Sequence, residues 1–250
     1  MFSVEERDTL LADHPDAEPL LKRFVSGEDF IWNKLRYCLW LKGESPAKYA
    51  RIPIIVERLK RVAERRRQSP TASVKAAADS PAVFTQIRQP ETEYLAIPQT
   101  SSERREYIPI GFMSPDIIAS DKIILVPEAT PYLFGVLTSS MHMAWMRTVA
   151  GRLKSDYSYY PAVYNNYPWP TPTAEQKGQI EACAQGVLDA RALYPDCSLA
   201  DLYDPLTMPA ELRKAHRALD AAVERAYGRK FKDDAERVAH LFELYQELTK

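Results

Sequence analysis

Lys154 and Asp156 stand two positions apart in the stretch GRLKSDYSYYPAVYNNYPWP, which runs from Gly151 to Pro170. In an extended chain, side chains two positions apart project from the same face, so the pair would present a donor beside an acceptor. A lysine donates to O6 and N7 of guanine and an aspartate accepts from N4 of cytosine, so the pair fits a G·C base pair in the major groove. The alternative is a local surface ion pair worth about 0–1 kcal/mol. The two residues alone leave both interpretations open.

Further polar residues around this pair are candidates for contacts with phosphate. Arg104 and Arg105, together with Ser101 and Ser102, could hold phosphates or could anchor a turn through Glu103. Most of the five tyrosines in the quoted stretch are expected to pack the loop, with one or two hydroxyls on phosphate. An asparagine before YPWP could read adenine or cap a turn. The candidates from this stretch are Arg152, Tyr157, Tyr159 and Asn165.

Common catalytic motifs are missing from the sequence. It has only eight glycines and no Gly-rich loop after a strand, so it carries no dinucleotide or S-adenosylmethionine fingerprint. A phosphate-binding P-loop, His-Glu-x-x-His and Gly-x-Ser-x-Gly are also absent. His142, in SSMHMAW, is expected to be a packed structural histidine, with a nucleic-acid contact as the alternative. The three cysteines show no zinc spacing. We therefore expect no catalytic residue, bound cofactor or metal in these residues.

Charge is distributed unevenly along the 250 residues, although the net charge is only −1. Residues 51–170 carry 15 Lys and Arg against 11 Asp and Glu, whereas residues 1–50 carry 7 against 9 and residues 171–250 carry 11 against 14. A basic centre between acidic ends indicates an anionic partner at the centre. No apolar run is long enough for a membrane span, and the acidic N-terminus does not read as a signal peptide. We expect a cytoplasmic protein with no membrane partner.

Two kinds of element are expected to position the candidate residues. Helices are expected from Ala17 to Gly27, from about Ala47 to Gln68 with a kink at Pro53, and from about Pro131 to Leu153. Short strands are expected in LRYCLWL, AVFTQI, EYLAIP, REYIPIGF and KIILVP, and residues 151–170 are expected to form an extended loop. Thr173 and Gln176 predict a capping box that opens the first of three C-terminal helices. The predicted fold is α+β: a mixed α/β domain of short strands and long recognition loops at 1–170, followed by a small all-α domain at 171–250.

Three segments carry a resemblance to a known family: SSERREYIPIGF, FGVLTSSMHMAWMRTVAGRLKSDY and VYNNYPWP. They resemble the target recognition domain of the MmeI-like DNA methyltransferases, single-chain type II restriction–modification enzymes that methylate adenine. LADLYDPLTMPAELRKAHRALDAAVERAYG resembles the helical C-terminal domain that follows it. In this family a nuclease and a methyltransferase domain with an Asn-Pro-Pro-aromatic motif precede the region. No Asn-Pro-Pro occurs here, so the resemblance implies a specificity function without chemistry.

The resemblance assigns base-reading positions to two pairs of residues. Lys154 and Asp156 match the pair that reads the base immediately 3′ of the methylated adenine, and Lys122 and Ser158 match the pair for the base immediately 5′. Many relatives carry arginine at the position of Ser158, so we expect Lys122 to take over the guanine contact here. A solvated lysine on a strand end is the alternative for Lys122. The implied recognition core is 5′-GAG-3′ with the central adenine modified.

The resulting hypothesis is a sequence-specific double-stranded DNA recognition module of an adenine-specific methyltransferase, non-catalytic by itself. The expected partners are double-stranded DNA and a methyltransferase domain, in cis or in trans, which would bind S-adenosylmethionine. A free-standing specificity subunit is the alternative of the same class. A helical protein-interaction module whose basic centre binds an acidic protein is the alternative of a different class.

Overall fold

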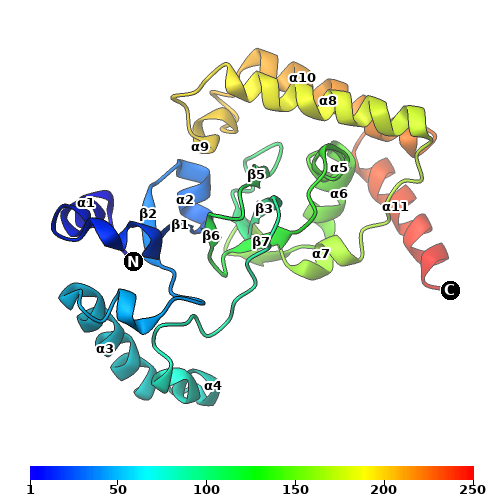
Figure 1. Ribbon diagram of the computed structural model, residues 1–250. Helices are drawn as coiled ribbons and strands as arrows, with labels where there is room; N and C mark the ends of the chain where they lie inside the picture. The colour runs from blue at the N-terminus through cyan, green and yellow to red at the C-terminus, as the bar shows by residue number, and fades with distance from the viewer. The chain divides into compact units, whose positions relative to one another are not determined.

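The computed structural model describes all residues from 1 to 250 and divides the chain into two compact units. Unit 1 comprises residues 1–25, 35–89 and 116–118, and unit 2 comprises residues 26–34, 90–115 and 119–250. Each unit therefore contains segments that are distant in the sequence. The predicted α+β class is confirmed by the mixture of short strands and helices (Figure 1).

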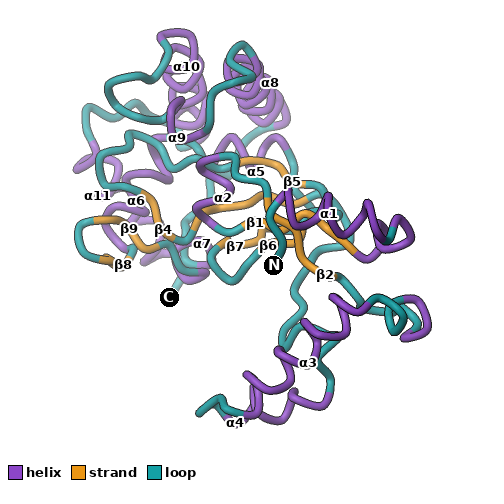
Figure 2. Tube along the Cα trace, turned by 90° about the vertical axis from the view of Figure 1, so that its left-hand side faces the viewer, coloured by secondary structure: helices purple, strands orange, loops and turns teal.

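Unit 1 combines a small antiparallel sheet with short helices. β1 (Leu21–Val25) pairs antiparallel with β2 (Arg36–Leu39), and β6 (Ile118–Ala119) lies on the other side of β1. The core of the unit contains Phe2, Leu20 and Ile55, which are fully buried. Its helical elements are α1 (Val4–Asp13), η1 (Pro15–Leu20), η2 (Pro46–Lys48), α3 (Pro53–Arg67), α4 (Ala72–Ala76) and η3 (Ala77–Asp79). Figure 2 shows α4 beside the C-terminal end of α3.

Unit 2 contains two small antiparallel sheets and most of the helices. The first sheet has the order β5 (Gly111–Met113), β3 (Tyr94–Pro98), β7 (Ile123–Val126). The second has the order β4 (Thr100–Ser101), β9 (Asp156–Ser158), β8 (Gly151–Leu153). The helices are α2 (Gly27–Trp32), α5 (Pro131–Leu137), α6 (Ser140–Val149), α7 (Pro161–Asn165), α8 (Ala174–Ala192), α9 (Leu199–Leu202), α10 (Ala210–Ala226) and α11 (Asp234–Leu248).

The long C-terminal helices share their hydrophobic core with the strands of unit 2. α8 and α10 lie side by side and also contact α5 (Figure 1). The common core joins Leu95 and Phe134 to Ile180 and Leu219, all of them fully buried. At Gly135 a side chain would begin only 2.8 Å from Cγ2 of Ile180, so glycine lets α5 and α8 approach closely. Residues on both sides of the predicted domain boundary near Pro170 thus pack together, and that boundary stays a prediction.

Capping residues set the beginnings of several helices. The Thr173 hydroxyl accepts from the Gln176 amide at 3.2 Å, and the Gln176 side chain accepts from the Thr173 amide at 2.8 Å. The predicted capping box is therefore confirmed. Asp233 caps α11, and Gly228, with φ +78°, follows the end of α10 as expected for a left-handed terminating residue.

The predicted helix over Ala17–Gly27 is wrong from Leu21 onward, whereas residues 17–20 lie in the 3-10 helix η1. Leu21–Val25 is a strand because it finds a partner in β2, and tertiary pairing overrides the local helical pattern. Gly27 begins helix α2 instead of ending a helix, because Ser26 and Asp29 form a capping box there. A side chain at Gly27 would begin 3.0 Å from the Lys122 carbonyl oxygen, so this glycine permits a close approach of two backbones.

The structure differs from three further predictions. Pro53 is the first residue of α3 and produces no kink, because the missing N–H is not needed in the first turn. The helix expected at Pro131–Leu153 is two helices, which separate where Ser139 caps α6 and end at Val149. Of the expected strands, AVFTQI forms none and REYIPIGF contributes only its last two residues to β5.

Candidate nucleic-acid interface

The candidate pair Lys154 and Asp156 lies in a tight hairpin and not in an extended loop. β8 and β9 pair antiparallel with Leu153 opposite Asp156, so Lys154 and Ser155 form the turn between them. Lys154 has φ +57°, in the left-handed region that such a turn requires. The expectation that Lys154 and Asp156 share one face of an extended strand is therefore wrong. A left-handed turn residue interrupts the alternation of side chains on which that expectation rested.

Lys154 is exposed at the tip of the hairpin and has no ion-pair partner in the chain. The alternative of a local ion pair with Asp156 is therefore not realised in this structure. Leu153, beside it, is 60% exposed. The hairpin tip thus offers one unpaired cation and one apolar side chain to a partner.

Arg152 holds the hairpin turn in place. Its Nη1 donates to the Ser155 carbonyl oxygen at 2.8 Å, and its guanidinium carbon lies 3.8 Å from the centre of the Tyr157 ring. Its Nη1 is also 3.7 Å from Oε2 of Glu103. The same guanidinium therefore contacts the turn, the neighbouring strand and the segment after β4. Sequence reasoning made Arg152 a candidate for phosphate contact, and the structure adds a function within the hairpin.

Asp156 is tied to the segment that carries Arg104 and Arg105. Its Oδ1 accepts from the Glu103 amide at 3.3 Å, so the carboxylate closes a turn. Arg105 Nη1 lies 3.5 Å from the Ser101 hydroxyl. Burial lowers the pKa of Arg105, and the charge of Asp156 opposes that shift. Arg104 is exposed, and only its amide hydrogen bonds within the chain, to the Ser102 hydroxyl at 3.4 Å.

The second pair consists of an exposed and a buried residue. Lys122 precedes β7, with its Nζ 3.3 Å from Oδ2 of the adjacent Asp121, and its side chain is 63% exposed. Ser158 is 5% exposed and lies on β9 between Thr100 of β4 and Gly151 of β8. Lys122 is therefore accessible to a partner, whereas Ser158 is enclosed by its sheet.

Three tyrosines in β9 and directly after it, Tyr157, Tyr159 and Tyr160, have different environments. Tyr157 is buried beneath Arg152. Tyr159 is 1% exposed, and its hydroxyl lies 2.9 Å from Nε2 of His142. This position leaves Tyr159 no surface for a phosphate contact, because the core encloses it. Tyr160, next in the chain, is 49% exposed.

The expectation that His142 is structural is confirmed, because it is fully buried and hydrogen-bonded to Tyr159. Burial lowers the pKa of His142 to about 4, so it is neutral at pH 7. The ring also meets Tyr167 edge-on at 5.0 Å. His142 thus anchors the chain just after the hairpin to helix α6.

The aromatic and proline-rich segment after the hairpin is fastened to the core. Trp145 Nε1 donates to the Val163 carbonyl at 3.0 Å, and the Tyr227 hydroxyl oxygen lies 2.8 Å from both the Tyr167 hydroxyl and the Pro168 carbonyl oxygen. Trp169 packs edge-on against Tyr167. Trp145 lies in the core and Trp169 packs against it. Of the polar candidates in this segment, Asn165 is exposed at the end of α7.

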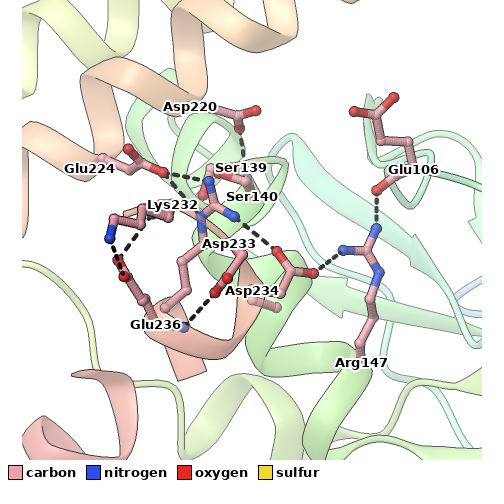
Figure 3. Close-up of polar contacts among 12 residues, drawn as sticks. Glu106, Ser139, Ser140, Arg147, Asp220, Glu224, Lys232, Asp233, Asp234 and Glu236 are labelled. Carbon is pink, nitrogen blue, oxygen red and sulfur yellow. Dashed lines mark hydrogen bonds and ion pairs between the residues drawn. The ribbon is translucent and has the colours of Figure 1, made fainter. Parts of the chain in front are cut away.

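A polar network that sequence reasoning missed joins α6 to the C-terminal helices (Figure 3). Arg147 pairs with Asp234 at 2.8 Å, and Asp234 also pairs with Arg237, which reaches Glu224 at 2.7 Å. Its members are separated by up to 90 positions and carry no periodic signal, so the sequence alone could not have revealed it. The network holds α6, which precedes the hairpin directly, against α10 and α11.

A second polar contact in the same region involves the buried carboxylate of Asp220. It accepts from the Tyr107 hydroxyl at 2.7 Å and from the Ser140 amide at 2.6 Å. Burial raises the pKa of Asp220 to about 6, and these two hydrogen bonds oppose the shift. Asp220 thereby joins α10 to the start of α6.

No group of three or more His, Cys, Asp or Glu side chains is placed to hold a metal ion. The helices also include none with the length and apolar character needed to cross a membrane. The exposed polar groups among the candidate residues are those of Arg104, Lys122, Lys154 and Asn165, of which Lys154 lies at the hairpin tip. Together with the α+β fold, this arrangement defines a module that presents side chains to a partner.

Comparison with known proteins identifies the module. Residues 1–171 match the model of the family described as MmeI, target recognition domain, and residues 172–250 match MmeI, C-terminal domain. The chain belongs to the MmeI family over these two domains.

Two relatives extend the comparison. DNA methyltransferase A of Bacillus subtilis (strain 168) is 39% identical over 254 residues, which cover 100% of this chain and 28% of that protein. The solved structure of the type IIL restriction–modification enzyme MmeI in complex with DNA superposes with a TM-score of 0.96 at 44% identity. That match covers 99% of this chain and 33% of the MmeI chain. The chain thus spans about a third or less of the length of these relatives.

Proposed function

We propose that this chain is the sequence-specific, double-stranded DNA recognition region of an adenine-specific DNA methyltransferase of a restriction–modification system. The observation that carries the proposal is the likeness, over 99% of the chain, to an enzyme solved in complex with DNA. The exposed and unpaired Lys154 on a braced hairpin supports it, because rigid presentation of a donor favours discrimination between bases. The polar contacts on phosphate come from exposed Arg104 and from Asn165.

The chemistry of the proposed enzyme takes place outside these residues. The relative named DNA methyltransferase A is more than three times as long as the segment that this chain matches. This length supports a methyltransferase domain in cis, which would bind S-adenosylmethionine, over a free-standing specificity subunit. These residues hold neither a cofactor loop nor an Asn-Pro-Pro motif.

The proposed base contacts follow the two pairs that the family resemblance assigns. Lys154 donates to guanine 3′ of the methylated adenine, and Lys122 donates to guanine 5′ of it, which makes the core 5′-GAG-3′. Asp156 is partly buried and bonded to the Glu103 amide, so its second oxygen is the one available to a cytosine amino group. Ser158 acts by its small volume within the sheet. Each correct contact contributes about 1–3 kcal/mol of discrimination.

The test exchanges the charges of the first pair in the complete enzyme. We expect Lys154→Glu with Asp156→Arg to change the modified motif from 5′-GAG-3′ to 5′-GAC-3′, read by mapping methylated adenines across a genome. The matched control exchanges an ion pair on α8, Lys177→Glu with Glu181→Arg, and should leave the motif unchanged. A wild-type motif without guanine on both sides of the adenine refutes the assignment. A hairpin variant that is active and keeps its motif refutes it as well.

A further inference from the structure

The segment from residue 45 to residue 89, in unit 1, is far more basic than the rest of the chain. It carries ten Lys and Arg against three Asp and Glu, a net charge of +7 in a chain whose net charge is −1. Helix α3 holds six of the ten cations. Lys and Arg clustered along one helix, where they lack partners within the chain, are the electrostatic footprint of an anionic partner.

Two arginines of α3 have structural partners. Arg58 donates from Nη1 to the Met1 carbonyl at 2.7 Å and lies 3.8 Å above the Phe2 ring. Arg66 donates to the carbonyl oxygens of Ala77 and Ser80, both at 2.9 Å, and to that of Val83 at 2.8 Å. Burial lowers the pKa of Arg66. These two side chains fix α3 to its own unit. Their charges therefore have a structural role and need no external anion.

The other four cations, Lys60, Arg61, Arg65 and Arg67, are exposed. Lys60 and Arg65 have no ion-pair partner. Arg61 pairs with Glu57 at 2.6 Å and Arg67 with Asp79 at 3.7 Å, but all four of these side chains are more than half exposed. Exposed ion pairs contribute little to stability, so an incoming anion can displace them.

The helix dipole accounts for only part of this charge. Cations in the last turn of a helix are stabilised by the partial negative charge at its C-terminus, which applies to Arg65 and Arg67. Lys60 and Arg61 lie before that turn. From Lys60 to Arg67 the helix rises about 10 Å, which corresponds to roughly three phosphate steps along one strand of B-DNA.

We infer that Lys60, Arg61, Arg65 and Arg67 form a second DNA-contacting surface, the α3 basic face, which binds the phosphate backbone of a duplex without reading its sequence. The inference rests on the proposed function, since it assigns to unit 1 the sequence-independent part of DNA affinity. The base-reading candidates all lie in unit 2. The α3 basic face therefore contributes to affinity, whereas the hairpin contributes to specificity.

The test measures binding of the full chain to a fluorescent duplex of random sequence across a series of salt concentrations. The variant replaces the four cations by glutamine, which preserves helix propensity. The matched control, Lys177→Gln with Lys214→Gln, Arg217→Gln and Lys230→Gln, removes the same charge from exposed positions outside α3. Thermal unfolding verifies that both variants are folded.

We expect the α3 variant to bind the duplex at least roughly 10-fold more weakly at 50 mM salt, and the slope of log K against log salt to fall by about 2–4. The control should stay close to the wild-type slope. A folded α3 variant with the wild-type slope overturns the inference and leaves the proposed function standing, whereas a wild-type chain that binds no duplex overturns both. An equal loss of affinity in the control would show that binding depends only on the net charge of the chain, and this result overturns the inference. If poly-L-glutamate displaces the fluorescent duplex as strongly as unlabelled duplex does, the inference is overturned and the surface is reassigned to an acidic protein partner.

Discussion

Replacing Tyr159 by phenylalanine should destabilise the protein although it removes only one oxygen atom. The Tyr159 hydroxyl and Nε2 of His142 lie 2.9 Å apart in the core, with exposures of 1% and 0%. Because burial keeps His142 neutral at pH 7, the lost interaction is a hydrogen bond between neutral groups. The variant leaves a ring nitrogen of His142 buried without that partner, which costs about 1–3 kcal/mol. The space left by the missing oxygen is too small for the surrounding side chains to repack around the phenylalanine.

The assay is thermal unfolding at pH 7, in which a loss of 2 kcal/mol lowers Tm by about 4–8 °C for a chain of this length. Tyr160→Phe is the matched control, because the adjacent ring is 49% exposed and its hydroxyl makes no hydrogen bond within the chain. We expect the control to stay within about 0.5 kcal/mol of the wild type. Equal effects of the two substitutions refute the reasoning.

A double substitution sharpens this test. Replacing both partners by apolar groups removes the unsatisfied nitrogen, so Tyr159→Phe combined with His142→Leu should cost less than the sum of the single substitutions. Strictly additive losses show that the two side chains stabilise the fold independently, and contradict an anchor that depends on their contact.

Three further predictions concern the hairpin, the helix packing and acid stability. Arg152→Ala and Arg152→Lys should both accelerate amide exchange in β8 and β9 by roughly 10-fold, because neither keeps the planar guanidinium contacts. Full protection of these amides in the lysine variant would show that a positive charge alone suffices to hold the hairpin. Gly135→Ala should lower the free energy of unfolding by about 1–3 kcal/mol, since its new methyl would meet Ile180 at 2.8 Å; a neutral result in urea unfolding contradicts this. His142, with its lowered pKa, destabilises the fold as pH falls from about 6.5 toward 4, whereas Asp220, with its pKa raised to about 6, opposes that loss over the same window. Asp220→Asn should therefore steepen the fall in the free energy of unfolding between pH 6.5 and 4, and an unchanged slope rules out that opposition.

Local signals predicted much of the secondary structure. The capping box at Thr173 depends on residues within one turn of the chain, so the sequence contains the whole interaction. Leu21–Val25 was predicted as a helix because its partner strand lies beyond an intervening helix, and no local pattern encodes that pairing. Pro53 was placed inside a helix because the start of the element could not be located from periodicity.

The residues of the candidate site stay a prediction, and their geometry could not be predicted from the sequence. The types and spacing of Lys154 and Asp156 indicated the hairpin region, yet the alternation rule failed because Lys154 adopts a left-handed conformation. Tyr159 was a surface candidate because a run of tyrosines carries no sign of which ring is buried. Its partner His142 lies on a separate helix, so only the folded structure distinguishes the anchor from its exposed neighbour Tyr160.

The core shared between the strands of unit 2 and helices α8 and α10 has a consequence for how target preference can change during evolution. A recombination event that replaced residues 1–170 with those of a distant relative would set Ile180 and Leu219, which pack against Gly135 here, against a segment selected with other neighbours. Many such hybrids would lose stability before any new preference could be selected. Substitutions at Leu153 and Lys154 avoid this conflict, because both residues are exposed at the hairpin tip. New target sequences in this lineage should therefore arise by point substitution at the tip more readily than by exchange of whole domains.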